Sequence, residues 1–105
     1  MTITVRLITG VAAQARGLRG TYPVPEGVLY LFPRVRSRTL STIGMHEGIN
    51  VLCLDAHGGV LELERPVPSG IEVELPPGTA HVVEAAAGTP ITPNLSAVLE
   101  ALTRA

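Results

Sequence analysis

Short stretches in which apolar and polar residues alternate run through most of this chain. At its start, Ile3, Val5 and Leu7 take every second position, which places them on one face of a strand spanning residues 2–8. Other runs, alternating or apolar throughout, predict further strands at residues 28–32, 35–43, 49–55, 60–65 and 71–75. Loops rich in proline and glycine separate these runs. We therefore expect a mainly β domain of about six short strands.

Two of the predicted strands carry pairs of glutamates at alternate positions. In the earlier of them, Leu61 and Leu63 are expected to face the core. The glutamates of both strands are expected to face outward: Glu62, Glu64, Glu72 and Glu74. The run 49–55 is instead apolar on both faces, which is typical of a strand inside a sheet. Asp55 then opens a glycine-containing hairpin loop.

Three segments predict short helices. Residues 11–18 form the first, which the glycines that follow limit. The second, 79–87, begins with Thr79 as a cap and stops at Gly88. This second helix would place His81 in its first turn, facing solvent.

The C-terminal segment 93–104 gives the clearest helical pattern. Thr92 is expected to be its N-cap, and Pro93 suits the first helical position. Four apolar residues follow at helical spacing and form one stripe: Leu95, Val98, Leu99 and Leu102. The stripe predicts packing onto the core, with docking onto another chain as the alternative.

These elements predict the fold class. The 105 residues fit one domain over 1–105, made of a β core and the C-terminal helix. Apolar residues make up 46% of the chain, so it can bury a core, and the scarcity of aromatics makes that core aliphatic. We expect a compact antiparallel β-barrel or rolled sheet with two or three short helices.

Charge and composition remove several function classes. The net charge of −1 gives no general attraction to nucleic acid or to anionic membranes. A single cysteine excludes an intrachain disulfide. The apolar runs are far shorter than the roughly 20 residues that span a bilayer, and no signal-peptide pattern is visible. We expect a location in the cytoplasm or within a larger assembly.

The histidines and the cysteine carry little catalytic signal. His46 and Glu47 resemble the start of a zinc-protease motif, but Asn50 stands where its second histidine must lie. The other two histidines share no ligand spacing with it, so we expect no metal and no cofactor. Cys53 lies in an apolar strand and is expected to be a core residue. No nucleophile elbow, phosphate loop or dinucleotide fingerprint occurs, which disfavours an enzyme.

The basic residues contain one suggestive pattern. Arg34, Arg36 and Arg38 recur at every second position, which would put three guanidinium groups on one face of a strand. Their partners would be the outward glutamates or the surface of another protein. Contact with phosphate or nucleic acid is disfavoured by the near-neutral net charge.

The run TIGMHEGINVLCLDAHGGVLE resembles the core signature of domain-of-unknown-function family 192, a group of small prokaryotic proteins. Three further elements match that family in the same order over about residues 3–90: Arg16-Gly17-Leu18, Glu26 to Leu29 with Phe32-Pro33, and Val73 to Pro76 with Gly78-Thr79-Ala80. The family's Pro-aliphatic-Asp step stands here as Gly48-Ile49-Asn50, which replaces a carboxylate with an amide. The family has no established activity, so the resemblance implies no catalytic residue.

Two functional hypotheses follow. The first is a non-enzymatic β module that contacts other protein chains, as a homo-oligomer or as an accessory or structural subunit such as a virion or envelope component. Its contacts would use the three arginines and the C-terminal apolar stripe. The second is a small-ligand or metal-binding protein with a site near the Met45–Asn50 turn, formed by His46, Glu47, Asn50 and Asp55.

Overall fold

The structure is a computed structural model that describes residues 2–105. Along the chain its elements are β1 (Thr4–Leu7), α1 (Val11–Arg16), β2 (Val28–Phe32), β3 (Thr39–Ser41), β4 (Ile49–Leu54), β5 (Arg65–Val67), β6 (Glu72–Glu74), β7 (His81–Ala86), a 3₁₀ turn (Thr92–Asn94) and α2 (Leu95–Leu102). The strands predicted at 28–32, 49–55 and 71–75 are confirmed as β2, β4 and β6. The predicted C-terminal helix is confirmed as the 3₁₀ turn and α2.

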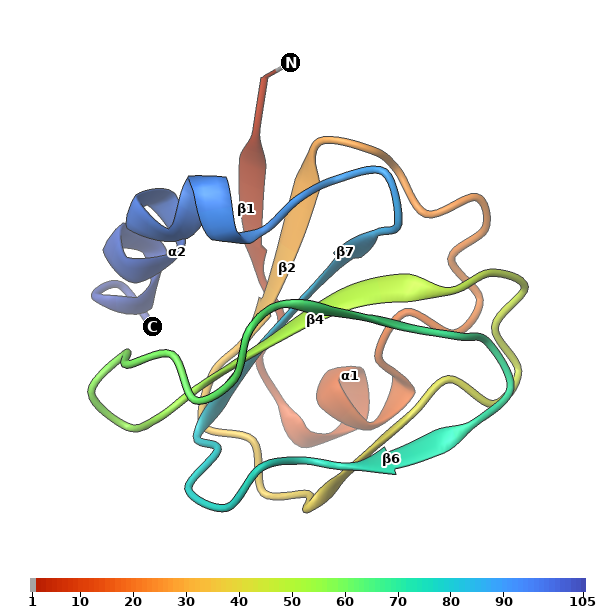
Figure 1. Cartoon of the computed structure of the whole chain (residues 1–105), viewed down its shortest axis with the longest axis horizontal. Helices are drawn as coiled ribbons and strands as arrows, with labels where there is room; N and C mark the ends of the chain where they lie inside the picture. Colours follow the sequence, from red (N-terminus) through yellow and green to blue (C-terminus); the bar gives the residue numbers. More distant parts are fainter. Residues whose placement is uncertain (1) are drawn as a thin grey trace.

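Five strands form one mixed sheet in the order β1-β2-β7-β4-β5, and β3 pairs with β6 in a second, two-stranded sheet (Figure 1). All neighbouring strands are antiparallel except β1 and β2, whose parallel pairing requires the crossover that contains α1. The expectation of a mainly β domain is confirmed. Among the described residues no closed barrel is found, because β1 and β5 are the two edges of the larger sheet.

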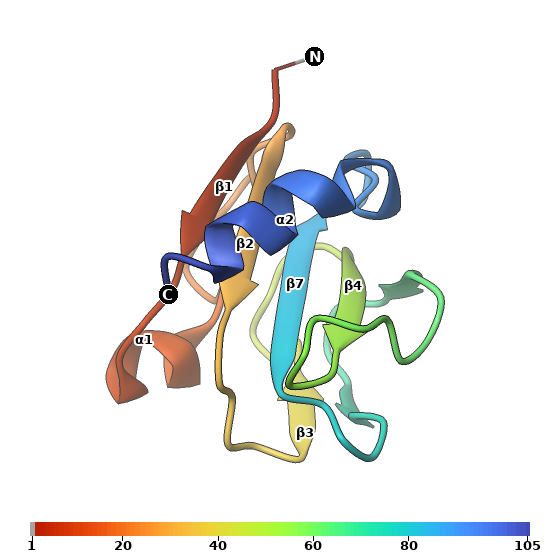
Figure 2. The same cartoon turned by 90° about the vertical axis from the view of Figure 1, so that its left-hand side faces the viewer.

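One face of the five-stranded sheet is covered by α2, which crosses in front of the strands in Figure 2. This face buries alternate residues of three strands: Leu29, Leu31, Leu52, Leu54, Val83 and Ala85. Val98 and Ala101 of α2 are fully enclosed against them, and Leu95, Leu99 and Leu102 pack around the edge. The predicted inward face of the first strand is confirmed, because Ile3, Val5 and Leu7 join this cluster.

The opposite face of the sheet is covered by α1, the loops and the smaller sheet (Figure 1). The strands place a second apolar set on this face: Tyr30, Phe32, Ile49, Val51, Cys53, Val82 and Ala86. Leu18 and Leu40 reach it from the loop after α1 and from β3. The two faces therefore hold separate clusters, made by alternate residues of the same strands.

The helix predicted at 79–87 is wrong, because this segment forms β7, the middle strand of the sheet. All six residues of β7 are buried. Strands β2 and β4 bind it on both sides, and the β-branched Val82 and Val83 fit such a pleated surface. The Thr79 hydroxyl, expected to cap a helix, instead donates to the carbonyl of Pro76 and closes a turn.

The strand predicted at 60–65 is also wrong over most of its length. Apart from one isolated bridge at Val60, pairing begins only at Arg65, and Leu63 is 88% exposed. Glu64 points inward, because its carboxylate accepts hydrogen bonds from the backbone N–H groups of Ile91 and Thr92. Glu64, which is distant in sequence, therefore accepts the hydrogen bonds at the start of the helix that Thr92 was expected to accept as the N-cap.

The long strand predicted at 35–43 is reduced to the three residues of β3. Arg34 adopts a left-handed backbone conformation with φ of 52°, which ends β2 in a turn. Residues 35–38 that follow are irregular. Arg34, Arg36 and Arg38 therefore do not share the face of a strand.

No helix formed by residues 2–105 combines the length and apolar character required to cross a membrane.

Candidate ligand-binding pocket

A single row of side chains crosses the sheet on the face opposite α2. The register pairs neighbours from β1 to β5 in this order: Arg6, Tyr30, Glu84, Val51 and Arg65. Residues opposite one another in adjacent strands share a face and lie about 5 Å apart. The row therefore has arginines at both edges of the sheet and a carboxyl in the middle strand.

Glu84 is the unusual member of this row, because its side chain is only 8% exposed. Among the described residues, no group donates a hydrogen bond to its carboxyl, and burial alone raises the pKa of Glu84 from 4.5 to about 7. Among residues 2–105, every side-chain oxygen that is fully enclosed has a hydrogen-bond partner. The carboxyl of Glu84 consequently keeps some contact with open space, and that space is a pocket.

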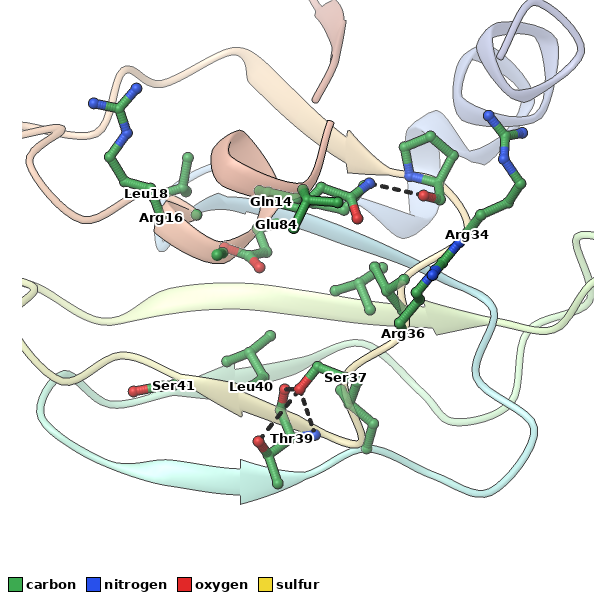
Figure 3. Close-up of a pocket in the computed structure, with 18 of the residues that line it drawn as sticks. Gln14, Arg16, Leu18, Arg34, Arg36, Ser37, Thr39, Leu40, Ser41 and Glu84 are labelled. Carbon is green, nitrogen blue, oxygen red and sulfur yellow. Dashed lines mark hydrogen bonds between the residues drawn. The ribbon is translucent and has the colours of Figure 1, made fainter. Parts of the chain in front are cut away.

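The pocket has a volume of about 550 Å³ and lies between α1 and the segment that joins β2 to β3. Its inner wall is mainly apolar and includes Leu18, Phe32 and Leu40. Gln14 holds α1 in place, since its side-chain amide donates to the carbonyls of Ile8 and Pro33 at 3.0 and 2.8 Å. Glu84 lies beneath α1 on the buried side of this pocket, with Arg16 and Arg34 on either side of it (Figure 3).

Arginines stand around the opening of the pocket. Arg16, Arg34 and Arg36 line it and are exposed, and Figure 3 shows the guanidinium groups of Arg16 and Arg34 pointing outward at opposite ends. The one ion pair among residues 2–105 joins Arg104 to Glu100, so these arginines have no carboxylate partner there. Arg19 also lines the pocket, but it donates to the carbonyls of Ala15 and Arg16 at the end of α1.

His81 positions one side of the opening. The backbone N–H of Arg34 donates to Nδ1 of His81 at 3.0 Å, and the N–H of Val35 donates to the carbonyl of Ala80 at 2.8 Å. The expectation that His81 faces solvent is wrong, because this side chain is 5% exposed. Burial is the main cause that lowers the pKa of His81, and the neutral ring leaves Nδ1 free to accept.

The residues proposed for a site near the Met45–Asn50 turn are engaged in structural contacts. Glu47 accepts a hydrogen bond from the N–H of Val24 at 2.8 Å, and the ring of His46 lies 4.5 Å from that of Tyr22. The amide of Asn50 donates to the carbonyls of Ala87 and Thr89, both at 3.1 Å. A carboxylate accepts only, so the aspartate expected from the family resemblance could not make these two bonds.

Asp55, the fourth residue of that proposed site, lies at the other end of β4. Asn50 and Asp55 are five residues apart along this strand, roughly 16 Å at about 3.3 Å per residue. Its carboxylate accepts from the N–H groups of Gly59 and His57, both at 2.8 Å, and these bonds lower the pKa of Asp55. The predicted loop opened by Asp55 is confirmed, although only one bridge follows it, and Gly58 takes the positive φ of 85° that the loop needs.

The remaining candidates fall outside the pocket. Cys53 is buried as expected, and that burial raises the pKa of its thiol. Arg38 is exposed and does not line the pocket. The apolar stripe of α2 packs within its own chain, which accounts for the stripe without a partner. No group of three or more histidine, cysteine, aspartate or glutamate side chains capable of holding a metal ion occurs within residues 2–105.

Comparisons with known proteins bear on the fold and not on the function of the pocket. No family model matches the chain. No curated protein matches it either. A crystal structure of a protein of unknown function from Novosphingobium aromaticivorans DSM 12444 is similar to it with a TM-score of 0.67 and 17% sequence identity. The similarity covers 90% of this chain and 69% of that one, and it shows that the two share a fold.

Sequence reasoning missed Glu84 because it assigned this residue to a helix. In a helix that ends at a glycine, one glutamate among alanines and valines is an ordinary solvent-facing residue. The signal that could have found it is the apolar run around it, HVVEAAA, in which the glutamate is the only acid. If that run is a strand inside a sheet, its glutamate must be buried on one face.

Proposed function

We propose that this protein binds a small molecule in the pocket beneath α1, with Glu84 as the central polar contact. The supporting observation is the Glu84 carboxyl, which is almost fully buried, has no hydrogen-bond donor among the described residues and opens onto the pocket. A buried polar group without a partner is costly, and a ligand donor removes that cost. Groups whose pKa is strongly perturbed, as that of Glu84 is, cluster at functional sites.

The shape of the pocket also supports this proposal. Ligand sites are concave, mostly apolar and carry a few convergent polar groups, with volumes of roughly 300–1,000 Å³. A volume of about 550 Å³ with an apolar inner wall fits that description. The tether of α1 through Gln14 means that the pocket is formed before any ligand arrives.

A screen of small metabolites by thermal shift, followed by amide chemical-shift mapping, tests the proposal. A ligand at 100 times its Kd stabilises the protein by about 2.7 kcal/mol, which raises its Tm measurably. The amides that shift should be those of the pocket, with Leu40 and Glu84 among them. The Glu84→Gln variant should lose the Tm increase, whereas Glu62→Gln, an exposed residue outside the pocket, should keep it.

Two results of this screen would contradict the proposal. One is a panel in which no compound raises the Tm or moves a pocket amide. The other is binding that maps to the Met45–Asn50 turn, which would favour the site expected from the sequence.

The hypothesis of a module that contacts other protein chains stays a prediction. Its premise of an arginine stripe on one strand face no longer holds, and α2 packs within the chain. Size-exclusion chromatography with light scattering tests it directly, with a stable oligomer as the supporting result. Membership of domain-of-unknown-function family 192 likewise stays a proposal, supported by the four motifs in order.

A further inference from the structure

The inner end and the opening of the pocket beneath α1 carry opposite charge. Five charged side chains line it: Arg16, Arg19, Arg34, Arg36 and Glu84. Glu84 is the only one of these at the buried inner end, where its neighbours Phe32 and Val82 are apolar. The arginines are at the opening, and the Arg16 and Arg34 guanidinium groups point away from Glu84 (Figure 3).

The pKa of Glu84 supports a separation between its carboxyl and the arginines. Burial is the only cause that shifts the pKa of Glu84, and no arginine contributes. A guanidinium within roughly 4–6 Å would favour the ionised carboxylate and lower that pKa. The pocket therefore has a carboxyl on its buried side and separate guanidinium groups at its opening, and its lining includes the apolar Leu18 and Leu40.

We propose that the ligand of this pocket is a small zwitterion, with an ammonium group at Glu84, an anionic group at the rim arginines and an apolar body between them. This inference rests on the proposed function and names the ligand class. The ammonium group supplies the donor that the Glu84 carboxyl lacks, and the pair is charge-assisted. At the other end, Arg34 and Arg36 present guanidinium donors without carboxylate partners among the described residues.

The same arrangement disfavours simpler ligands. A plain anion that fills the pocket brings its apolar tail to Glu84 and leaves the carboxyl without a donor. A plain amine satisfies Glu84 but must pass the arginines at the opening and gains nothing from them. Only a molecule that carries both charges at opposite ends uses both parts of the pocket.

Three linear probes of matched length test the proposal: 6-aminohexanoate, which has both charges, hexanoate, which lacks the amine, and hexylamine, which lacks the carboxylate. A fourth, 6-hydroxyhexanoate, replaces the ammonium with a neutral donor. Shorter and longer ω-amino acids adjust the spacing. Affinities come from calorimetric titration and from amide chemical shifts, using the full chain.

The expected result is that at least one ω-amino acid binds at the pocket about tenfold or more tightly than the probes that lack one charge or carry the neutral donor. Glu84→Gln and Arg36→Gln should each weaken that binding by about tenfold. Arg38→Gln is the matched control, because Arg38 is exposed in the same segment but does not line the pocket. This variant should bind the ω-amino acid with the affinity of the parent.

The zwitterion proposal is overturned if hexanoate, hexylamine or 6-hydroxyhexanoate binds as tightly as the ω-amino acids, or if none of the ω-amino acids binds. Either result leaves the proposed function standing when another compound of the screen moves the pocket amides and loses affinity in Glu84→Gln. If no compound of any class does so, both proposals fail together.

Discussion

The two faces of the five-stranded sheet differ in how completely they are closed. The face under α2 holds Leu52, Val83 and Val98, each at 1% exposure or less, and no buried acid belongs to its cluster. The opposite face holds Glu84 and the pocket beneath α1. Helix α2 places two buried residues on its face, whereas α1 has none and is tethered through polar contacts.

This difference separates a part of the molecule that stabilises the fold from a part that costs stability. Burial of apolar side chains contributes roughly 25 cal/mol per Å², and the α2 face is built only from such burial. A carboxyl that is buried without a donor is destabilising and persists in a fold only if the rest compensates. Residues 83 and 84 belong to these two faces although they are neighbours in β7.

The largest expected effect comes from placing the same acid on the closed face. Val83→Glu puts a carboxyl where no pocket receives it, so the free energy of unfolding should fall by about 4 kcal/mol or more. Urea denaturation followed by circular dichroism measures the change. A variant within about 1 kcal/mol of the parent would show that the α2 face is less closed than its exposures indicate.

The second expected effect is a pH-dependent gain from Glu84→Gln. The folded-state pKa of about 7 lies above the ordinary 4.5, so the folded chain binds this proton more tightly than the unfolded chain. The parent therefore has the associated stability below pH 4.5 and loses it as the pH rises through 7. Glutamine cannot ionise, so the variant should exceed the parent by about 3 kcal/mol at about pH 8 and match it near pH 4.

Denaturation curves at several pH values decide this prediction. Glu62→Gln makes the same change in charge on an exposed residue and should run parallel to the parent. If the free energy of unfolding of Glu84→Gln has the same pH dependence as that of the parent, a donor stabilises the carboxyl of Glu84.

A smaller loss is expected where the sheet connects to α2. Glu64→Gln weakens the charge-assisted bonds to Ile91 and Thr92, which lie at 2.8–3.0 Å, and should cost about 1–2 kcal/mol. Hydrogen exchange should speed up at those two amides before it does so at Val83. Equal exchange rates in Glu64→Gln and Glu62→Gln would show that the cap does not hold the start of the helix.

The smallest effects are expected at the opening of the pocket. Arg36→Gln and Arg38→Gln replace exposed side chains without a described ion-pair partner, so each should change the free energy of unfolding by less than about 0.5 kcal/mol. A larger change for Arg36 alone, in the same denaturation assay, would mean that this side chain supports the fold and is a poor reporter of ligand binding.

Much of the closed face could be predicted from the chain. The alternation of Ile3, Val5 and Leu7 and the helical stripe of α2 each identify their buried side without reference to other segments. The apolar run of β4 identifies a strand that is buried on both faces. The open face could not be predicted in this way. Its pocket needs α1, the segment after β2 and the middle of β7 to meet, and these are more than 50 residues apart at the extremes.

The three arginines and the site expected near the Met45–Asn50 turn also show that local sequence patterns do not predict which side chains meet in the fold. A period of two at Arg34, Arg36 and Arg38 predicts a shared face only if the backbone is extended, and the left-handed turn at Arg34 removes that condition. His46, Glu47 and Asn50 are close in sequence, but their polar atoms are used by distant backbone groups or lie against Tyr22. Nearness in sequence therefore identified residues that hold the fold together.

The amino-acid pattern by itself determined a mainly β fold, its aliphatic core, the buried Cys53, the loop at Asp55 and the helix at the end, because each depends on periodicity or turn chemistry within a few residues. Only the tertiary structure decided that 81–86 is the middle strand. Local propensities in that segment are weak, and pairing with β2 on one side and β4 on the other outweighs the cap-like residues at its ends. That pairing also turns Glu84 from a solvent-facing helical residue into the buried carboxyl of the pocket.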